Sequence, residues 1–255
     1  MEDNRQERNA LLSRLPPDEL ARFRRGMRFV QLEPGAVLHQ ADAPIEQIYF
    51  PLDGVVSLHT TFNSGQVVDF AVVGAEGVVG GLAASGVTCE PYGARVQVAG
   101  SALVAHTDAF LEFLSESDAA REMVGKFQAT LLLQAQQIAA CNAVHGVEAR
   151  MCRWLLQIRD RTHSNVLPVT QEFLSHMLGV QRTTVTLVEQ SLKAAGLVRQ
   201  RRGRIELLDE AGLRARACEC YGHIQRDYRQ VMPQANVDGG VPAGDASALA
   251  RAMVA

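Results

Sequence analysis

The chain of 255 residues is 47% hydrophobic and 21% charged, which is typical of folded domains and excludes a disordered chain. No apolar run reaches the length of a membrane span, and the first thirty residues lack the apolar segment of a secretory signal, so we expect a cytoplasmic protein without a membrane partner. The net charge of −3 is unevenly divided: residues 1–149 carry 10 Lys/Arg against 18 Asp/Glu, whereas residues 150–214 carry 11 against 6. A basic block beside an acidic one favours two domains, of which the basic one faces a polyanion.

Residues 27–106 predict short β-strands separated by turn signals. These signals include Pro34-Gly35, Asp53-Gly54 and Asn63-Ser64-Gly65, and the last of them joins two apolar-rich runs. It predicts a hairpin with a three-residue loop. Many short strands at regular spacing are typical of an antiparallel sandwich or barrel.

The periodicity changes at Asp108, and no proline follows until Pro168. A short helix is predicted over 108–117 and a longer one from Asp118 to about Ala143. Apolar residues recur along the longer helix at spacings of three and four: Val124, Phe127, Leu131, Ala135 and Ile138. From the pattern alone, a helix lying on its own domain and a subunit interface are equally favoured.

Another amphipathic helix is predicted in VEARMCRWLLQIRDR, and His145-Gly146 before it predicts a hinge. The last thirty residues are rich in Gly, Ala and Pro, which predicts a loosely ordered tail.

The strongest functional signal lies in residues 167–208. Thr170 predicts the N-cap of a short helix, and Gly179 permits a sharp turn into a second helix from about Gln181 to Ala195. Two helices joined by such a turn form a helix-turn-helix, whose second helix enters the DNA major groove by its N-terminal residues. An αα-hairpin within a helical core is the alternative interpretation.

An arginine-rich hairpin follows the second helix, with Gly203 at its predicted tip. Such a wing binds phosphates without reading sequence, whereas Arg182 can grip guanine O6 and N7. The turn glycine, the polar helix end and the arginine hairpin agree independently, which favours the DNA-binding interpretation. The predicted DNA-binding residues are Thr170, Gln181, Arg182, Thr183, Thr184, Thr186, Arg199, Arg201, Arg202 and Arg204.

On these features the chain resembles the CRP/FNR family of bacterial transcription regulators over nearly all of residues 20–220. The most specific matches are ACNAVHGVEARMCRWLL and TQEFLSHMLGVQRTTVT. The resemblance implies an α+β fold: an N-terminal cyclic-nucleotide-binding-like β-roll, a long dimerisation helix and a C-terminal winged helix-turn-helix. It implies a homodimer on a two-fold site in double-stranded DNA, with RNA polymerase as a further candidate partner.

The resemblance also assigns the parts of the chain. It makes the helical stripe named above the predicted dimer interface and places an effector pocket in the β-roll, facing that helix. The implied division is an N-terminal arm (1–20), the β-roll (21–117), the dimerisation helix (118–144), the winged helix-turn-helix domain (145–225) and a flexible tail (226–255).

The recognition helix departs from the catabolite activator type of this family. That type begins Ser-Arg-Glu-Thr-Val, whereas this chain has Gln181-Arg182-Thr183-Thr184-Val185. The arginine is kept, the base-reading glutamate is a threonine, and the second base-reading arginine falls on Leu187. We therefore expect the binding mode to carry over and the operator sequence to differ.

The glycine-rich stretch VVGGLAASG, residues 78–86, lies where the family carries its phosphate-binding cassette. The cassette glutamate is missing from Gly80-Gly81-Leu82, Tyr92-Gly93 falls where its arginine would be, and Arg95 in an alternating strand should point elsewhere. A buried phosphate without its cation is unfavourable, so we expect no binding of cyclic AMP or cyclic GMP. The predicted effector pocket comprises Gly80, Gly81, Leu82, Ala83, Gly93 and Ala94.

The sequence predicts neither a metal site nor a catalytic site. The five scattered cysteines indicate a reducing compartment, and none precedes Cys89, which argues against the iron–sulfur centre of the family's oxygen sensor. Cys218, Cys220 and His223 could be half a metal site, but no partner pair is evident, so buried inert thiols are favoured. No catalytic motif supports an enzyme, and no cofactor is assigned. A ligand-binding module that acts through a protein partner is the alternative to a DNA-binding regulator.

Overall fold

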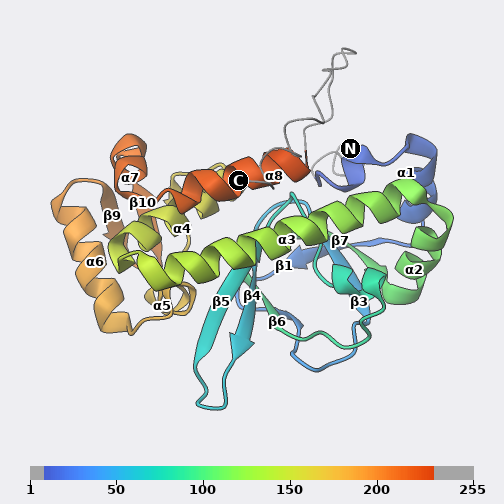
Figure 1. Ribbon diagram of the computed structural model, residues 1–255, viewed down its shortest axis with the longest axis horizontal. Coiled ribbons are helices and arrows are strands. Elements are labelled where there is room, and N and C mark those ends of the chain that lie inside the picture. Colours follow the sequence, from blue (N-terminus) through green and yellow to red (C-terminus); the bar gives the residue numbers. More distant parts are fainter. Residues whose placement is uncertain (1–8, 233–255) are drawn as a thin grey trace, which may run out of the picture.

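The computed structural model describes residues 9–232, in which a β-roll is followed by helices and a small C-terminal sheet (Figure 1). The strands are β1 (Arg28–Leu32), β2 (Val37–His39), β3 (Gln47–Pro51), β4 (Val55–Thr61), β5 (Val67–Val73), β6 (Gly93–Val98), β7 (Gly100–His106), β8 (Val166–Leu167), β9 (Val198–Arg201) and β10 (Arg204–Leu207). The helices are η2 (Leu12–Arg14), α1 (Pro17–Arg24), η3 (Gly81–Ser85), α2 (Thr107–Glu116), α3 (Asp118–Val144), α4 (Val147–Thr162), α5 (Gln171–Leu178), α6 (Arg182–Ala194), α7 (Glu210–Arg216) and α8 (Cys220–Val231). None of these helices is long and apolar enough to span a bilayer.

The β-roll consists of two antiparallel sheets that enclose one apolar core. Their strand orders are β1-β7-β3 and β2-β6-β4-β5, and both contribute buried side chains to a single cluster. The hairpin predicted at Asn63-Ser64-Gly65 is confirmed, since β4 and β5 pair from Val56↔Val73 to Thr61↔Val67. The predicted sandwich or barrel of short antiparallel strands is thus confirmed as well.

The predicted N-terminal arm is not separate from the β-roll. Leu11 and Leu12 are fully buried in its core, and Phe23 of α1 stacks on Phe113 of α2 with centroids 4.2 Å apart. The Asn9 amide donates to the carbonyls of Pro51 and Gly77 at 2.8 and 2.9 Å. The boundary predicted at residue 20 is therefore wrong for residues 9–20, because apolar burial joins them to the roll; residues 1–8 lie outside the described range.

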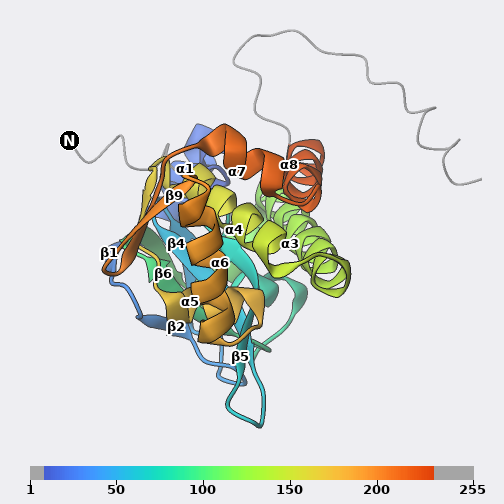
Figure 2. The ribbon, with the colours of Figure 1, turned by 90° about the vertical axis from the view of Figure 1, so that its left-hand side faces the viewer.

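Helix α3 begins where predicted and runs the length of the molecule, with α8 beside it and the β-roll behind it (Figures 1 and 2). The Ser117 hydroxyl caps it by accepting from the Ala120 amide at 3.0 Å. The chain breaks at His145-Gly146, as predicted, and continues as α4. Helix α8 extends to Val231, so the tail predicted from residue 226 is wrong for 226–231, while the rest of the predicted tail, from residue 233, lies outside the described residues.

Helix α4 lies buried between the two halves of the molecule. Its residues Trp154, Leu155 and Ile158 are fully buried in a second apolar cluster. That cluster also contains Val72 of β5 and Leu174 of α5, so the β-roll and the C-terminal helices share one core.

A buried polar contact lies beside this shared core, where β5 meets α5. Asp69 of β5 is 1% exposed and pairs across the sheet with His59 of β4. Burial raises the pKa of Asp69 to about 7, opposed by a hydrogen bond with Ser57 and by the charge of Arg95. Desolvation lowers the pKa of His59, and the charges of Arg95 and of His176 in α5 lower it further. Arg95 therefore belongs to this polar contact.

Replacing Asp69 by Asn should make stability less dependent on pH. The folded protein keeps a proton that the unfolded chain releases at a pKa near 3.8, so the wild type loses stability as the pH rises toward about 7. Asn has no proton to lose. The free energy of unfolding of the variant should therefore rise relative to that of the wild type by up to about 1.4 kcal/mol per pH unit across pH 5–7. Urea unfolding at several pH values measures this gap. Asp108→Asn, at a carboxylate 91% exposed, is the control; an Asp69→Asn gap independent of pH would contradict the assignment.

Candidate nucleic-acid interface

Helices α5 and α6 form the predicted helix-turn-helix. The Thr170 hydroxyl accepts a hydrogen bond from the Phe173 amide at 3.1 Å and caps α5. Gly179 has φ +62°, the left-handed conformation that ends α5 and turns the chain into α6. Val180, in the turn between the two helices, packs against the shared core.

The start of α6 presents a polar surface while the helix buries its other face. Val185 and Leu192 are fully buried, whereas Gln181, Arg182 and Thr183 are exposed. Thr184 and Thr186 are half-buried, and the Thr186 hydroxyl donates to the Arg182 carbonyl at 3.0 Å. Leu187 is 66% exposed, so an apolar side chain stands among the polar ones on the outer face.

A groove of about 570 Å³ joins the first turns of α5 and α6 to the wing formed by β9 and β10. Five of the predicted DNA-binding residues line it: Thr170, Arg182, Arg201, Arg202 and Arg204. The remaining five, Gln181, Thr183, Thr184, Thr186 and Arg199, lie outside the lining of this groove. The groove therefore gathers arginines from the start of α6 and from the wing around one concave surface.

Arg182 and Arg199 form ion pairs on the exposed surface of this site. Arg182 contacts Glu172 of α5 at 2.9 Å, with both side chains about 60% exposed. Arg199 donates to Glu206 across the wing at 3.0 Å. Exposed pairs of this kind contribute about 0–1 kcal/mol, so a phosphate or a guanine edge can displace the carboxylate.

Glu189 is a structural residue of this site that the sequence pattern did not indicate. Its carboxylate, on a residue 3% exposed, accepts hydrogen bonds from Gln171 of α5 at 2.6 Å and Gln200 of β9 at 2.8 Å. Desolvation raises its pKa, opposed by these two hydrogen bonds. One carboxylate thus ties α5, α6 and the wing together; its helical position among apolar residues was the available signal.

Comparison with known proteins gives matches to two family models in the same order as the two halves of the structure. A cyclic nucleotide-binding domain matches residues 29–117, and a Crp-like helix-turn-helix domain matches residues 149–216. The chain belongs to the CRP/FNR family of transcription regulators. It is a DNA-binding regulator of that type, and the family consists of regulators, not enzymes.

Solved structures of CRP/FNR regulators share the fold at low sequence identity. FixK2 from Bradyrhizobium japonicum is 14% identical, with TM-score 0.66 and coverage of 75% of this chain and 98% of that one. A CRP-family transcriptional regulator from Thermus thermophilus is 21% identical, with TM-score 0.64 and coverage of 74% and 96%. The c-di-GMP-responsive regulator CLP from Xanthomonas campestris is 17% identical, with TM-score 0.64 and coverage of 76% and 100%. Comparison with curated proteins gave no significant match.

In this CRP/FNR regulator, side chains fill the surroundings of the glycine loop. A Cβ on Gly80 would lie 2.7 Å from the His39 ring, and one on Gly81 would lie 2.5 Å from the Gln128 amide nitrogen. His39 pairs with Ala94 in the sheet, and its Nδ1 forms a buried hydrogen bond with the Glu90 carboxylate at 2.9 Å. The structure thus brings Gly80 and Ala94 together around His39, whose Nδ1 contacts the buried Glu90 carboxylate.

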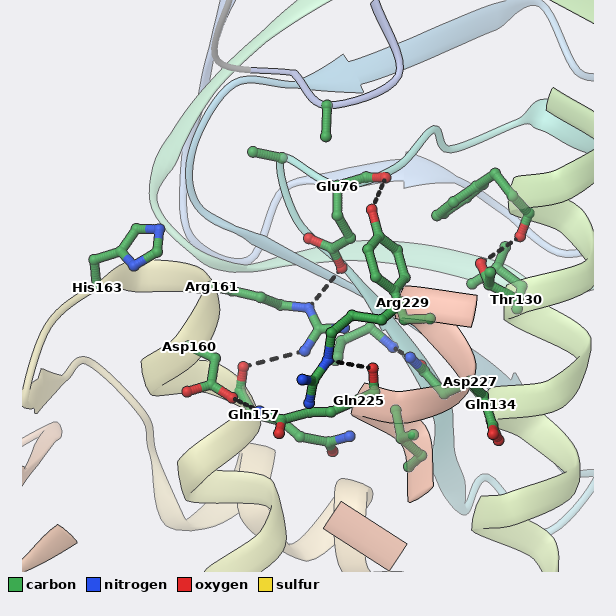
Figure 3. Close-up of a pocket in the computed structure, with 17 residues that line it drawn as sticks. Glu76, Thr130, Gln134, Gln157, Asp160, Arg161, His163, Gln225, Asp227 and Arg229 are labelled. Atoms are coloured by element: carbon green, nitrogen blue, oxygen red, sulfur yellow. Dashed lines mark hydrogen bonds and ion pairs between the residues drawn. The ribbon is translucent and has the colours of Figure 1, made fainter. Parts of the chain in front are cut away.

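A separate cavity of this regulator, about 460 Å³, lies where the β-roll, α3, α4 and α8 meet (Figure 3). Arg161 of α4 donates to Glu76, after β5, at 2.7 Å, and Tyr228 of α8 donates to the Glu76 carbonyl at 3.2 Å. Phe127 and Leu131 of the predicted dimer stripe line the same cavity. These contacts connect the β-roll to the DNA-binding half through named polar groups.

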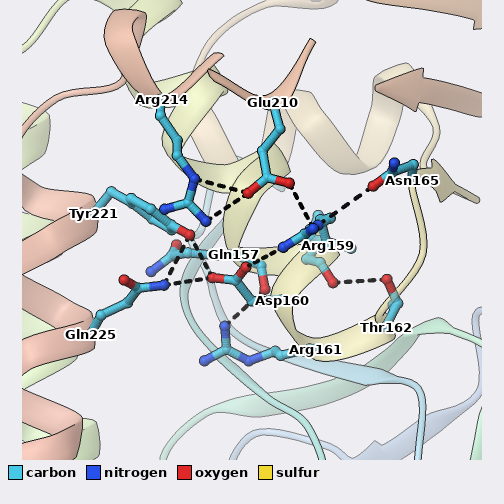
Figure 4. A network of polar contacts seen from close by, with 11 residues as sticks. Gln157, Arg159, Asp160, Arg161, Thr162, Asn165, Glu210, Arg214, Tyr221 and Gln225 are labelled. Carbon is cyan, nitrogen blue, oxygen red and sulfur yellow. Dashed lines mark hydrogen bonds and ion pairs between the residues drawn. The ribbon is translucent and has the colours of Figure 1, made fainter. Parts of the chain in front are cut away.

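A polar network extends from this cavity to α7 and α8 (Figure 4). The Asp160 carboxylate accepts from Tyr221 and Gln225 of α8, both at 2.7 Å. Arg159 contacts Glu210 of α7 at 2.6 Å. The C-terminal end of α4 is therefore fixed to both terminal helices.

Replacing Glu189 by Ala should lower the free energy of unfolding by about 1–3 kcal/mol, because it removes the buried carboxylate that accepts hydrogen bonds from the Gln171 and Gln200 amides. Chemical denaturation of the full chain measures the loss. Glu172→Ala removes an exposed carboxylate of α5 and should change stability by less than about 0.5 kcal/mol. Equal effects of the two substitutions would show that Glu189 does not tie the elements together.

Proposed function

We propose that this CRP/FNR regulator binds a two-fold DNA site as a homodimer. In each subunit the start of α6 enters the major groove and the wing lies on the backbone. The observation that carries the proposal is the groove that places Arg182 beside Arg201, Arg202 and Arg204. Cations on both sides of one concave surface match a duplex edge, where a base contact and phosphate contacts are made together.

The side chains divide into two roles in this proposal. Arg182 reads guanine, and Thr183 and the exposed Leu187 contact neighbouring bases, where leucine suits a thymine methyl group. The wing arginines and Thr170 bind phosphates and fix the register. Gln181, Thr184, Thr186 and Arg199 complete the contact surface around the groove.

We propose a dimer surface that differs from the stripe predicted from the sequence. Val124, Phe127 and Ile138 are at most 2% exposed because they pack into the chain's own cores, and Leu131 and Ala135 are half-buried. An exposed stripe with heptad spacing runs along the opposite face of α3: Gly125, Ala129, Leu132, Gln136, Ala139 and Ala143. Small residues around Leu132 let two α3 helices approach closely, so we place the interface there.

The proposal also includes the following assignments. The described part of the β-roll, residues 9–117, is the sensor, residues 118–144 the dimerisation helix and residues 145–232 the DNA-binding domain. The regulator acts in the cytoplasm, without catalysis, and contacts or excludes RNA polymerase at a promoter. Because the His39 ring fills the space beside Gly80 and is hydrogen-bonded to Glu90, the effector is neither cyclic AMP nor cyclic GMP.

Arg182→Ala should weaken binding to a DNA site selected from a random library by about 1–3 kcal/mol per half-site, while salt-sensitive binding to random DNA remains. Arg202→Ala should weaken both kinds of binding alike and reduce the salt slope. Fluorescence anisotropy at several salt concentrations measures both, with Arg25→Ala, at the end of the distant helix α1, as control. If Arg182→Ala lost the same affinity for selected and for random DNA, Arg182 would not read a base.

Leu132→Glu should convert the dimer to monomers, because it places a charge at the centre of the proposed seam. Sedimentation velocity measures the molecular mass. Phe62→Glu is the control, since Phe62 is an exposed apolar residue (52%) in the loop between β4 and β5, away from α3. A Leu132→Glu protein that stays dimeric would move the interface off this face of α3.

A further inference from the structure

Three cysteines and a histidine converge where α3 ends. Cys141 lies in the last turn of α3 and His145 directly after it, whereas Cys218 and Cys220 lie just before and at the start of α8. The three sulfur atoms and one imidazole nitrogen all lie within 4.8 Å of one another. The prediction that Cys218 and Cys220 lack a partner pair is therefore wrong: the fold supplies Cys141 and His145 from about 75 residues upstream.

The spacing of these atoms fits tetrahedral coordination. With Zn–S near 2.3 Å and Zn–N near 2.0–2.1 Å, the edges of a tetrahedron are about 3.8 Å between sulfurs and about 3.6 Å between sulfur and nitrogen. The Cys141 and Cys218 sulfurs are 3.5 Å apart, and the Cys220 sulfur is 3.5 Å from His145 Nδ1. These two separations lie within a few tenths of an ångström of the tetrahedral edges, and all the others are at most 4.8 Å, so side-chain adjustments of about 1 Å or less complete the ligand set.

The contacts around the cluster are those that orient metal ligands. With Nδ1 facing the sulfur of Cys220, the other ring nitrogen of His145 contacts the Glu219 carboxylate at 3.2 Å. The Gln137 amide donates to the Cys220 sulfur at 3.0 Å. A carboxylate behind a ligating histidine fixes its tautomer and raises its basicity.

An independent observation concerns charge. Arg153 of α4 is fully buried, and its Nε and Nη2 atoms have no hydrogen-bond partner among the described residues. Its Nη1 donates to the Gln157 side chain, and the guanidinium lies over the Trp154 ring at 4.5 Å. Its charge interacts with the sulfurs of Cys141 and Cys218. A buried cation needs a compensating anion, and three thiolates with one divalent ion carry a net charge of −1.

We propose that Cys141, His145, Cys218 and Cys220 bind one zinc ion in a closed, structural Cys₃His site. Thiolate and imidazole ligands in tetrahedral geometry select zinc over the harder divalent ions. All four coordination positions come from the protein, so the ion has no open position for substrate. It would join the hinge at His145-Gly146 to the start of α8, and so fix the DNA-binding domain against α3.

The test is the metal content of the full-length, reduced protein, produced with zinc in the medium and purified without chelators or a histidine tag. Mass spectrometry of the metal should find about one zinc per chain. Protein refolded with Co²⁺ instead should show the visible bands of tetrahedral thiolate coordination. Chelation during mild denaturation should lower the melting temperature, and Zn²⁺ should restore it.

Cys218→Ser and His145→Ala should lose most of the zinc, whereas Cys89→Ser, at an exposed cysteine outside the cluster, should keep it. If the cluster variants do not fold, titrating the wild-type thiols with a mercurial should release zinc in proportion. Two results would overturn the proposal. One is folded wild-type protein that takes up neither Zn²⁺ nor Co²⁺. The other is a Cys141–Cys218 disulfide in protein isolated under thiol-blocking conditions.

Discussion

Burial of α4 in a core shared by both halves is the constraint on which the rest of the structure depends. Val55, Val72 and Val98 of the β-roll lie in the same apolar cluster as Trp154 and Leu174 of the DNA-binding half. Exposing the three valines would cost roughly 1.5–3 kcal/mol each, as an upper bound. The winged domain therefore does not swing freely at the hinge, and any rearrangement has to offset this loss with new contacts.

The parts of the molecule that could be predicted from sequence are those that depend on local signals. The helix-turn-helix depends on local signals, the Thr170 cap and the Gly179 turn, and both residues do what the pattern indicated. The long helix and the break at His145-Gly146 were equally local. The wing could be predicted from a glycine tip between two short strands that carry arginines.

What sequence could not supply was the partner of each helix face. The stripe through Val124 and Ile138 has the right spacing for either of two partners, and only the tertiary structure shows that it faces its own cores. The exposed stripe through Leu132 is mostly alanine and glycine, so its hydrophobic signal is weak. The cysteine cluster was missed for a similar reason, because its two pairs are far apart in the chain and meet only when α8 packs on α3.

Regulation in this fold has to act on contacts at both ends of α4. At its C-terminal end, Arg161 bonds to Glu76 and Asp160 to Tyr221; at its N-terminal end, the hinge adjoins the cysteine cluster. An effector shifts the equilibrium only by its difference in affinity between two arrangements. A ligand in the cavity beside Arg161 would contact the β-roll, α3, α4 and α8 together, so it could bind one arrangement better than another. The glycine loop instead lies against His39 of the β-roll and Gln128 of α3. The junction cavity is thus the better placed of the two to couple sensing to DNA binding.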